Sequence, residues 1–424
     1  MVLKDTNAVP FEISTENETI DDGKDVQEIE SNEQTISIIK QVEDYLTSNY
    51  DFRFNIITKR LEFRKVDGQV FINVTDRDLN SIWFSCIENG IDCSKSNVRN
   101  LINSDFSKVF NPFREYFEDL PKFNGQEDYI KKLAVCFKLV NEEDRDYFEK
   151  YLKVFIRGIV GCAYDNDPNH TCLTLVGKQG IFKTTALNYL CPKSLRSKYL
   201  FSGSILGDKD SQIRMSTCFL INNDEFSTLN RTDIETFKSM LTMKEINIRL
   251  PYGHYAETLL RHASFVGSLN KTGFLNDTTG SRRFLIFEIE SIDIDELTNI
   301  DMDDVYSQAF SEYRLGMKYY LKQEDNIILQ TYNRRFDQFS QIEELLMTRY
   351  KIPESEKLKR YLTATQIADE CFISLKRKPT ETDIRKVGSY LSKHGFQQKR
   401  KRINGIFSRY WIVQRFRASS KYED

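Results

Sequence analysis

The stretch LTLVGKQGIFKTTALNYL, residues 173–190, decides the fold that we expect for this chain. Its apolar start leads into a loop with Gly177 and Gly180, and Lys183-Thr184 then opens a segment with helical spacing of apolar residues. Strand, glycine loop and helix in this order, with Lys-Thr at this distance from the first glycine, are typical of a phosphate-binding P-loop. The alternative is an ordinary strand-to-helix turn with a chance Lys-Thr pair.

Such a loop binds nucleotide through backbone N–H groups and a helix N-terminus that surround the phosphates. We expect Lys183 to neutralise the β and γ oxygens of ATP, and Thr184 to ligate Mg²⁺. The expected ATP-binding residues are Gly177, Gln179, Gly180, Lys183, Thr184 and Thr185.

One position departs from the pattern. Phe182 stands where a glycine usually precedes the lysine. Its ring has to point away from the phosphates if nucleotide is to enter, so this residue bears on the turnover rate more than on binding.

A second apolar run, residues 218–223, ends in Asp224-Glu225 about 40 residues after Lys183. This is the form of a Walker B strand. We expect Asp224 to hold Mg²⁺ through water and Glu225 to polarise the attacking water. A solvated helix N-terminus is the alternative for an isolated Asp-Glu pair, but its place behind the P-loop favours an ATPase.

Basic and aromatic residues follow this strand. Residues 232–242 have the apolar spacing of a helix, and Lys238 belongs to it. A strand and turn follow over residues 246–253. We expect single-stranded DNA to contact Lys238 of this helix and Lys244, Arg249 and Tyr252 of that hairpin, through charge and base stacking. A surface hairpin that packs Tyr252 on its own domain is the alternative.

Two further positions suit the ATPase site. Asn270 ends a buried strand at the place of sensor 1 in AAA+ ATPases, where it contacts the γ-phosphate or orients water; the alternative is an Asn that caps a turn. Arg282 and Arg283 follow a Gly-Ser turn and suit an arginine finger that reaches a neighbouring subunit. Only one of the two can point outward from an extended chain, and a salt bridge within the subunit is the alternative.

Composition excludes several other classes. The chain has 424 residues and a net charge of −3, and no apolar run is long enough to cross a membrane. Eight scattered cysteines without a C-x-x-C pair argue against zinc and against a disulfide framework, so we expect a reducing cytoplasm. The sequence also predicts no signal peptide.

We expect an α/β protein with five segments. Residues 1–35 are a disordered acidic leader, whose alternative role is to compete with DNA for basic surfaces. Residues 36–124 form a small α/β accessory domain, 125–335 the ATPase core with a mostly parallel sheet and helices over 129–140 and 144–162, and 336–360 a connector. In the accessory domain, Arg53, Lys59, Arg60 and Arg64 suit either contact with nucleic acid or an ordinary charged hairpin face.

The last segment, residues 361–424, has the outline of a winged helix: two helices and a basic hairpin. Its cations Lys399, Arg400, Lys401 and Arg402 suit phosphate contacts on duplex DNA. A winged helix that binds another protein is the alternative.

Taken together, the chain resembles the virulence-associated protein E family, ATPases of mobile elements and phages related to superfamily 3 helicases. The match covers residues 110–290. The resemblance implies nucleotide sites between the subunits of a hexameric or similar ring, and it assigns residues 238–252 to a motif near the DNA channel. No acidic metal-binding triad precedes the core, so primase activity is expected on a separate chain. The residues that carry the resemblance are 177–184, 223–226, 237–239, 249–253, 267–270 and 277–284.

The sequence therefore predicts an ATP-dependent DNA helicase or translocase that acts in replication of a mobile element, with ATP and Mg²⁺ as cofactors. The alternative is a DNA-binding initiator or interference regulator that ATP switches and that does not unwind DNA.

Overall fold

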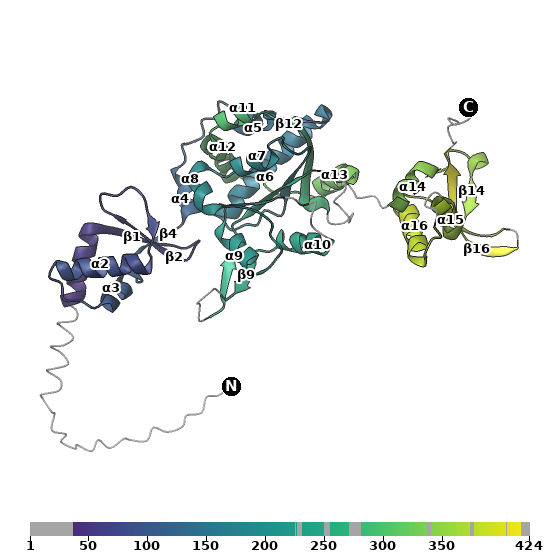
Figure 1. Ribbon diagram of the computed structural model, residues 1–424. Helices are drawn as coiled ribbons and strands as arrows, with labels where there is room; N and C mark the ends of the chain where they lie inside the picture. The colour runs from purple at the N-terminus through teal and green to yellow at the C-terminus, as the bar shows by residue number, and fades with distance from the viewer. Residues whose placement is uncertain are drawn as a thin grey trace, which may run out of the picture. The chain divides into compact units, whose positions relative to one another are not determined.

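A computed structural model describes residues 37–224, 226, 231–249, 255–270, 281–336, 341–373, 377–403 and 405–416 (Figure 1). The chain divides into two compact units, Met1–Tyr116 and Phe117–Asp424. The predictions for the acidic leader, Glu225 and Tyr252 fall outside the described residues.

The N-terminal unit is a four-stranded sheet, in the order β3-β2-β1-β4, with helices packed on one of its faces (Figure 1). Phe52 and Phe63 point from the sheet into the core with Leu79, Ile82 and Val98 of the helices. β1 and β2 form an antiparallel hairpin, and β2 continues through the Asp67-Gly68 turn to the short β3. The elements are a helix over 37–49, β1 (Tyr50–Asn55), β2 (Arg60–Lys65), β3 (Ile72–Asn73), α2 (Asp76–Glu88), α3 (Lys95–Ile102), β4 (Lys108–Phe110) and α4 (Pro112–Asp119).

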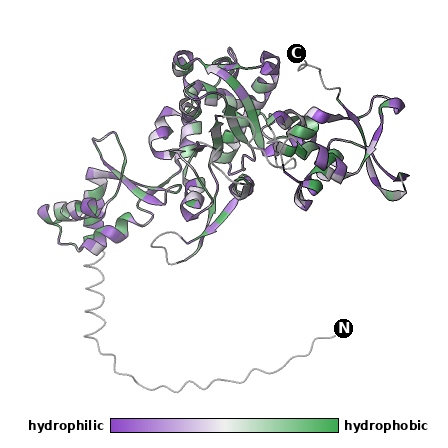
Figure 2. Ribbon diagram, turned by 45° about the vertical axis from the view of Figure 1, so that its right-hand side comes forward, coloured by the Kyte–Doolittle hydropathy of each residue, from purple (hydrophilic) through white to green (hydrophobic). Residues whose placement is uncertain are grey.

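The second unit contains a six-stranded sheet in the order β5-β12-β6-β11-β8-β7, in which β5 is antiparallel and the other five strands are parallel. These strands read as apolar runs because both faces of the sheet are covered, and Figure 2 shows them in the green of hydrophobic residues. The helix expected over 129–140 ends at Val135, and Phe137–Leu139 form the edge strand β5 instead. The strands are β5 (Phe137–Leu139), β6 (Cys172–Val176), β7 (Leu200–Ser202), β8 (Leu220–Asn223), β11 (Ser264–Leu269) and β12 (Phe284–Ile292).

The two faces of this sheet pack against different elements. On one face, Ile221, Phe265 and Ile286 share a core with Phe237 of α10 and with the hairpin of β9 and β10. On the other face, Phe287 packs edge-on against Phe148 of α6. The further elements are η1 (Glu142–Asp144), α5 (Tyr129–Val135), α6 (Arg145–Tyr164), α7 (Lys183–Tyr189), α8 (Lys193–Tyr199), α9 (Lys209–Thr217), α10 (Arg231–Met240), β9 (Glu245–Ile248), β10 (Glu257–Leu260), η3 (Ser281–Arg283), α11 (Ile294–Asn299), α12 (Met302–Arg314), α13 (Gln323–Asn333) and η4 (Arg334–Phe336).

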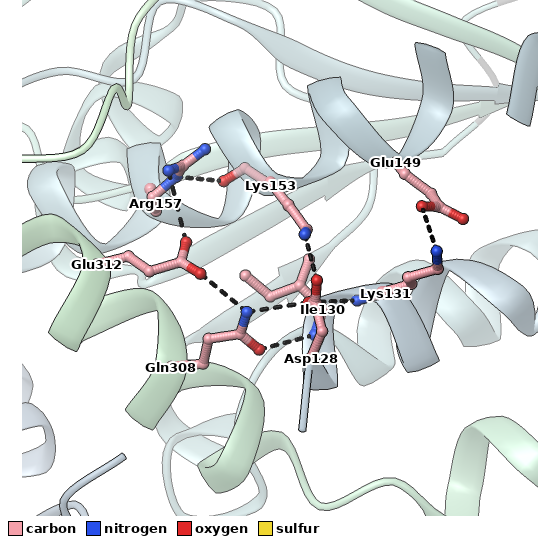
Figure 3. Close-up of polar contacts among 8 residues, drawn as sticks. All are labelled: Asp128, Ile130, Lys131, Glu149, Lys153, Arg157, Gln308 and Glu312. Atoms are coloured by element: carbon pink, nitrogen blue, oxygen red, sulfur yellow. Dashed lines mark hydrogen bonds and ion pairs between the residues drawn. The ribbon is translucent and has the colours of Figure 1, made fainter. Parts of the chain in front are cut away.

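A polar network ties α5 and α12 to α6 (Figure 3). The amide of Gln308 accepts a hydrogen bond from the backbone N–H of Ile130 at 3.1 Å and donates to Asp128 at 2.9 Å and to Glu312 at 2.8 Å. Burial alone would raise the pKa of Asp128, but hydrogen bonds from Lys153 and Gln308 outweigh it and lower that pKa. The network therefore fixes the helices that cover this face of the sheet.

The C-terminal part of this unit packs three helices on a small antiparallel sheet, in which β16 is flanked by β14 and β15. Its core includes Leu346, Ile367, Val387 and Trp411. The elements are α14 (Gln341–Arg349), β13 (Tyr350–Lys351), η5 (Glu356–Leu358), β14 (Arg360–Leu362), α15 (Ala364–Ile373), α16 (Glu381–Lys393), β15 (Gln398–Ile403) and β16 (Ile406–Arg415).

Candidate nucleotide-binding site

The loop between β6 and α7 is shaped by close packing at its start. A Cβ on Gly177 would lie 2.5 Å from the carbonyl oxygen of Ile289, so only glycine fits there. Gly180 has a φ of +86°, and Phe182 takes the left-handed conformation at φ 63° and ψ 23°. The Phe182 side chain is 53% exposed, so its ring lies outside the core that holds the loop. A non-glycine residue in this conformation costs on the order of 1–2 kcal/mol.

Lys183 is the first residue of α7 and is almost fully buried. Its ammonium donates to the carbonyl oxygens of Gly177 at 2.9 Å and Lys178 at 2.7 Å, and to Oδ1 of Asn270 at 3.1 Å. Burial lowers the pKa of Lys183, and the nearby Asp224 carboxylate opposes this shift. The loop thus surrounds a cation with neutral oxygens, and an anion bound there would stabilise its charge.

Asp224 follows β8 and accepts hydrogen bonds from two hydroxyl groups. The hydroxyl of Thr184 lies 3.1 Å from each carboxylate oxygen, and the hydroxyl of Ser268 lies 2.6 Å from Oδ1. On the same strand, Asn222 donates to the carbonyl oxygen of Thr184 at 3.2 Å and to the side chain of Asn188 at 2.8 Å. β8 therefore fixes the first turn of α7.

The oxygens of Thr184 and Asp224 suit a magnesium ion. The Thr184 hydroxyl and the Asp224 carboxylate lie 3.1 Å apart, and both are oxygen groups of the kind that Mg²⁺ prefers. Mg²⁺ keeps several of its waters in proteins, so the hydroxyl would ligate the ion directly and the carboxylate would hold one of its waters. With ATP bound, Mg²⁺ would neutralise charge on the phosphate oxygens at this position.

Asn270 reaches the site because β11 lies between β6 and β8. The face of β11 that carries Ser268 and Asn270 points toward α7, and the other face is closed by Phe226, which packs on Gly267. Sequence reasoning missed Ser268 and Asn222. The signal for both was a polar residue inside an apolar strand, two positions before an expected site residue.

Arg282 and Arg283 lie at the other end of the sheet. They form η3, directly before β12, whose first residue Phe284 pairs with Cys172 at the start of β6. The glycine loop follows the far end of β6, four residues or about 13 Å further along the strand. Both arginines line a cavity of about 560 Å³ with His170 and Tyr320. Neither forms an ion pair with a residue that the structure describes.

Some of the residues that we expect to contact DNA are exposed and one is buried. Lys244 and Arg249 are exposed and directly flank β9, one before the strand and one after it. Lys238 is placed differently from the prediction, because it is buried in α10 with its ammonium 2.8 Å from Glu235. Its position follows from helical spacing, since Ile234, Phe237 and Lys238 share one face of α10 and that face packs on the sheet. In this structure Lys238 offers DNA no surface.

The cations of the C-terminal hairpin are open to solvent. Lys399, Arg400, Lys401 and Arg402 are exposed on β15, which pairs with β16. The ammonium of Lys401 lies 4.5 Å from the ring centre of Tyr361. This strand thus presents successive charges on both of its faces.

A family model for the virulence-associated protein E-like domain matches residues 119–338, just over half of the chain. The chain belongs to the virulence-associated protein E-like family. The match spans the six-stranded sheet and every residue of the glycine-loop site. No curated protein matches the sequence.

The fold of this virulence-associated protein E-like chain also occurs in a solved structure. The apo structure of the NrS-1 C terminal region matches with a TM-score of 0.53 and 13% identity, over 89% of this chain and 99% of that one. Its A form matches with a TM-score of 0.48 and 12% identity, over the same shares of both chains.

Among the helices that the structure describes, none is long and apolar enough to cross a membrane.

Proposed function

We propose that this chain is an ATP-dependent DNA helicase or translocase that acts in replication of a mobile element and hydrolyses ATP between the subunits of a ring. One observation carries the proposal. Lys183 and Thr184 open α7, where Lys183 lies 3.1 Å from Asn270 at the end of β11 and Thr184 lies 3.1 Å from Asp224 at the end of β8. A buried ammonium beside a carboxylate and a hydroxyl suits binding and cleavage of Mg²⁺-ATP.

Each of the site residues is proposed to have a separate role. Lys183 would exchange its carbonyl partners for phosphate oxygens of bound ATP, and the backbone N–H groups of the glycine loop would donate to the phosphates. Thr184 would hold Mg²⁺ directly and Asp224 through water, with Ser268 orienting the carboxylate. Asn270, whose side chain contacts Lys183, would contact the γ-phosphate, and Glu225 is proposed to polarise the attacking water. The exposure of Phe182 supports a ring that leaves room for the phosphates.

The arginines support a site completed by a second subunit. At about 13 Å along the strand from their own loop, Arg282 and Arg283 do not reach the phosphates that Lys183 holds. A neighbouring subunit that covers this loop would present them from its opposite sheet edge, where they have no carboxylate partner among the described residues. This arrangement suits an arginine finger in a homo-oligomeric ring.

Mixing experiments test the shared site. We expect the double variant Arg282→Ala/Arg283→Ala to lower the rate of ATP hydrolysis by about 10³-fold, because an arginine finger raises kcat by 10³–10⁵-fold. The steady-state rate of mixtures with Lys183→Ala subunits is the measurement. If sites are shared, mixing restores activity only at interfaces that pair an intact loop with an intact arginine. Arginine variants as active as the parent would remove the finger assignment.

Strand displacement tests the proposed activity. The proposal predicts displacement of a labelled strand from forked DNA by the parent with ATP, and none by Lys183→Ala. DNA contacts are assigned to Lys244 and Arg249 for single strands and to residues 399–402 for duplex. Nucleotide-dependent assembly without displacement at either fork polarity would instead favour an ATP-switched initiator or interference regulator. Any primase that acts with this chain is proposed to be a separate protein.

A further inference from the structure

The N-terminal unit carries a surface with its own chemistry. Because side chains alternate along a strand, Phe52 and Phe63 enter the core while Arg53 and Arg64 project from the opposite face of the sheet. We call this opposite surface the outer sheet face. Its residues belong to the N-terminal unit, whereas the nucleotide site lies within residues 117–424.

Cations and rings alternate on the outer sheet face. The guanidinium carbon of Arg53 lies 3.9 Å from the ring centre of Phe71 and 3.4 Å from that of Phe110. Arg64 lies 4.6 Å from the same Phe71 ring. Four flat groups from β1, β2, the segment before β3 and the end of β4 thus form one stack.

Two carboxylates orient the stack. Glu62, 1% exposed, lies 2.7 Å from the guanidinium of Arg53 and accepts a hydrogen bond from the amide of Asn55 at 3.1 Å. Asp51 lies 2.8 Å from Arg64. These pairs fix the planes of both arginines and neutralise their charges, so any net positive charge on this face comes from other residues.

Arg60 and Lys108 supply that charge. Register places Arg60 opposite Asn55 and Lys108 opposite Arg53, so the two cations lie on β2 and β4, the strands on either side of β1. Both are exposed, and neither forms an ion pair with a described residue. Cations on both sides of stacked rings suit a single strand, because phosphates can bind the cations while bases stack on the rings.

A groove beside the stack is large enough for a nucleotide. Its volume is about 450 Å³, and its lining includes Arg53, Arg64 and Lys108. Asp51, already paired with Arg64, and the exposed Glu115 are the carboxylates in the lining. Phe71 and Phe110, whose rings stack on Arg53, line the same groove.

We propose that the outer sheet face of the N-terminal unit binds single-stranded DNA, with bases in the aromatic groove and phosphates on Arg60 and Lys108. A single strand offers both unstacked bases and phosphates, whereas duplex offers this face only phosphates. An acidic peptide would match the charge but not the rings. The inference is independent of the proposed ATPase function, because binding is measured without nucleotide.

The test uses the full chain with residues 399–402 changed to alanine, which removes the hairpin cations. Two double variants are compared: Arg60→Glu/Lys108→Glu, and the matched control Arg77→Glu/Arg99→Glu. The affinity of each for labelled oligo-dT and for duplex of equal length is measured by fluorescence anisotropy. The control residues are exposed on α2 and α3, and they receive the same charge change. We expect the first pair to weaken oligo-dT binding about tenfold or more and to reduce the salt slope by about 1.4.

A second variant separates stacking from charge. Phe71→Leu keeps every cation, and we expect it to weaken oligo-dT binding several-fold, by loss of about 1 kcal/mol or more of stacking, without change in the salt slope. Thermal melting checks that both variants fold. Equal losses in the charge pair and its control, or duplex binding that falls as much as oligo-dT binding, would overturn the proposal. Absence of ATP hydrolysis in the parent would leave this comparison intact.

Discussion

Replacing Lys183 with alanine is expected to lower ATP hydrolysis by about 10²–10³-fold, because it removes a cation that stabilises charge on the transferred phosphoryl group. Lys183 is buried, and its three hydrogen bonds all lie within the glycine loop or with Asn270. The measurement is the steady-state rate of phosphate release at saturating ATP.

Lys178→Ala is the matched control. This lysine belongs to the same loop, but its side chain lies outside the buried site, and only its backbone carbonyl contacts Lys183. We expect the control to keep its rate within about twofold, in line with a surface substitution away from the bound groups. Equal losses in the two variants would assign the effect to loop structure instead of to the Lys183 charge.

Replacing Gly267 with alanine is expected to destabilise the core by about 3 kcal/mol or more, because an added methyl overpacks a filled interior. Its Cβ would lie 1.9 Å from the ring of Phe226. That ring is 1% exposed and packs edge-on against Phe237 and Phe284, so it has no room to retreat. Thermal unfolding should shift down by roughly 6–12 °C, at about 2–4 °C per kcal/mol.

Two further variants make this result specific. Gly388→Ala adds the same methyl group in α16, where no atom lies within 4 Å, and a small gain in stability is expected from helix propensity. Phe226→Leu combined with Gly267→Ala should recover part of the loss, because the shortened side chain vacates the methyl position. A Gly267→Ala protein as stable as the parent would show that β11 and Phe226 are not in tight contact.

Patterns local in sequence predicted much of this fold. Residues 172–190 form a strand, loop and helix as expected, since an apolar run followed by Gly177, Lys183 and helical spacing leaves few other structures. The apolar run before Asp224 likewise forms a strand, β8, as expected. Each of these signals lies within about 20 residues, close to the window of about 11–18 residues in which periodicity is informative.

Contacts between strands were not predictable in this way. Ser268 bonds to Asp224 only because β11 and β8 are neighbours, and sequence alone does not give strand order. Lys238 shows the reverse case: its helical spacing with Ile234 and Leu241 already indicated the buried face, but its charge favoured a surface role. The edge strand β5 has three residues, too few for a period to appear.

Equilibrium binding of a non-hydrolysable ATP analogue to the parent protein tests most directly whether the glycine loop holds Mg²⁺-ATP. We predict saturable binding that weakens when Mg²⁺ is removed, because Thr184 and Asp224 are placed to hold the ion. Binding should be lost in Lys183→Ala and kept in Lys178→Ala. A parent protein that shows no saturable binding, or that binds the analogue no better than Lys183→Ala does, would contradict the assignment of this loop to nucleotide.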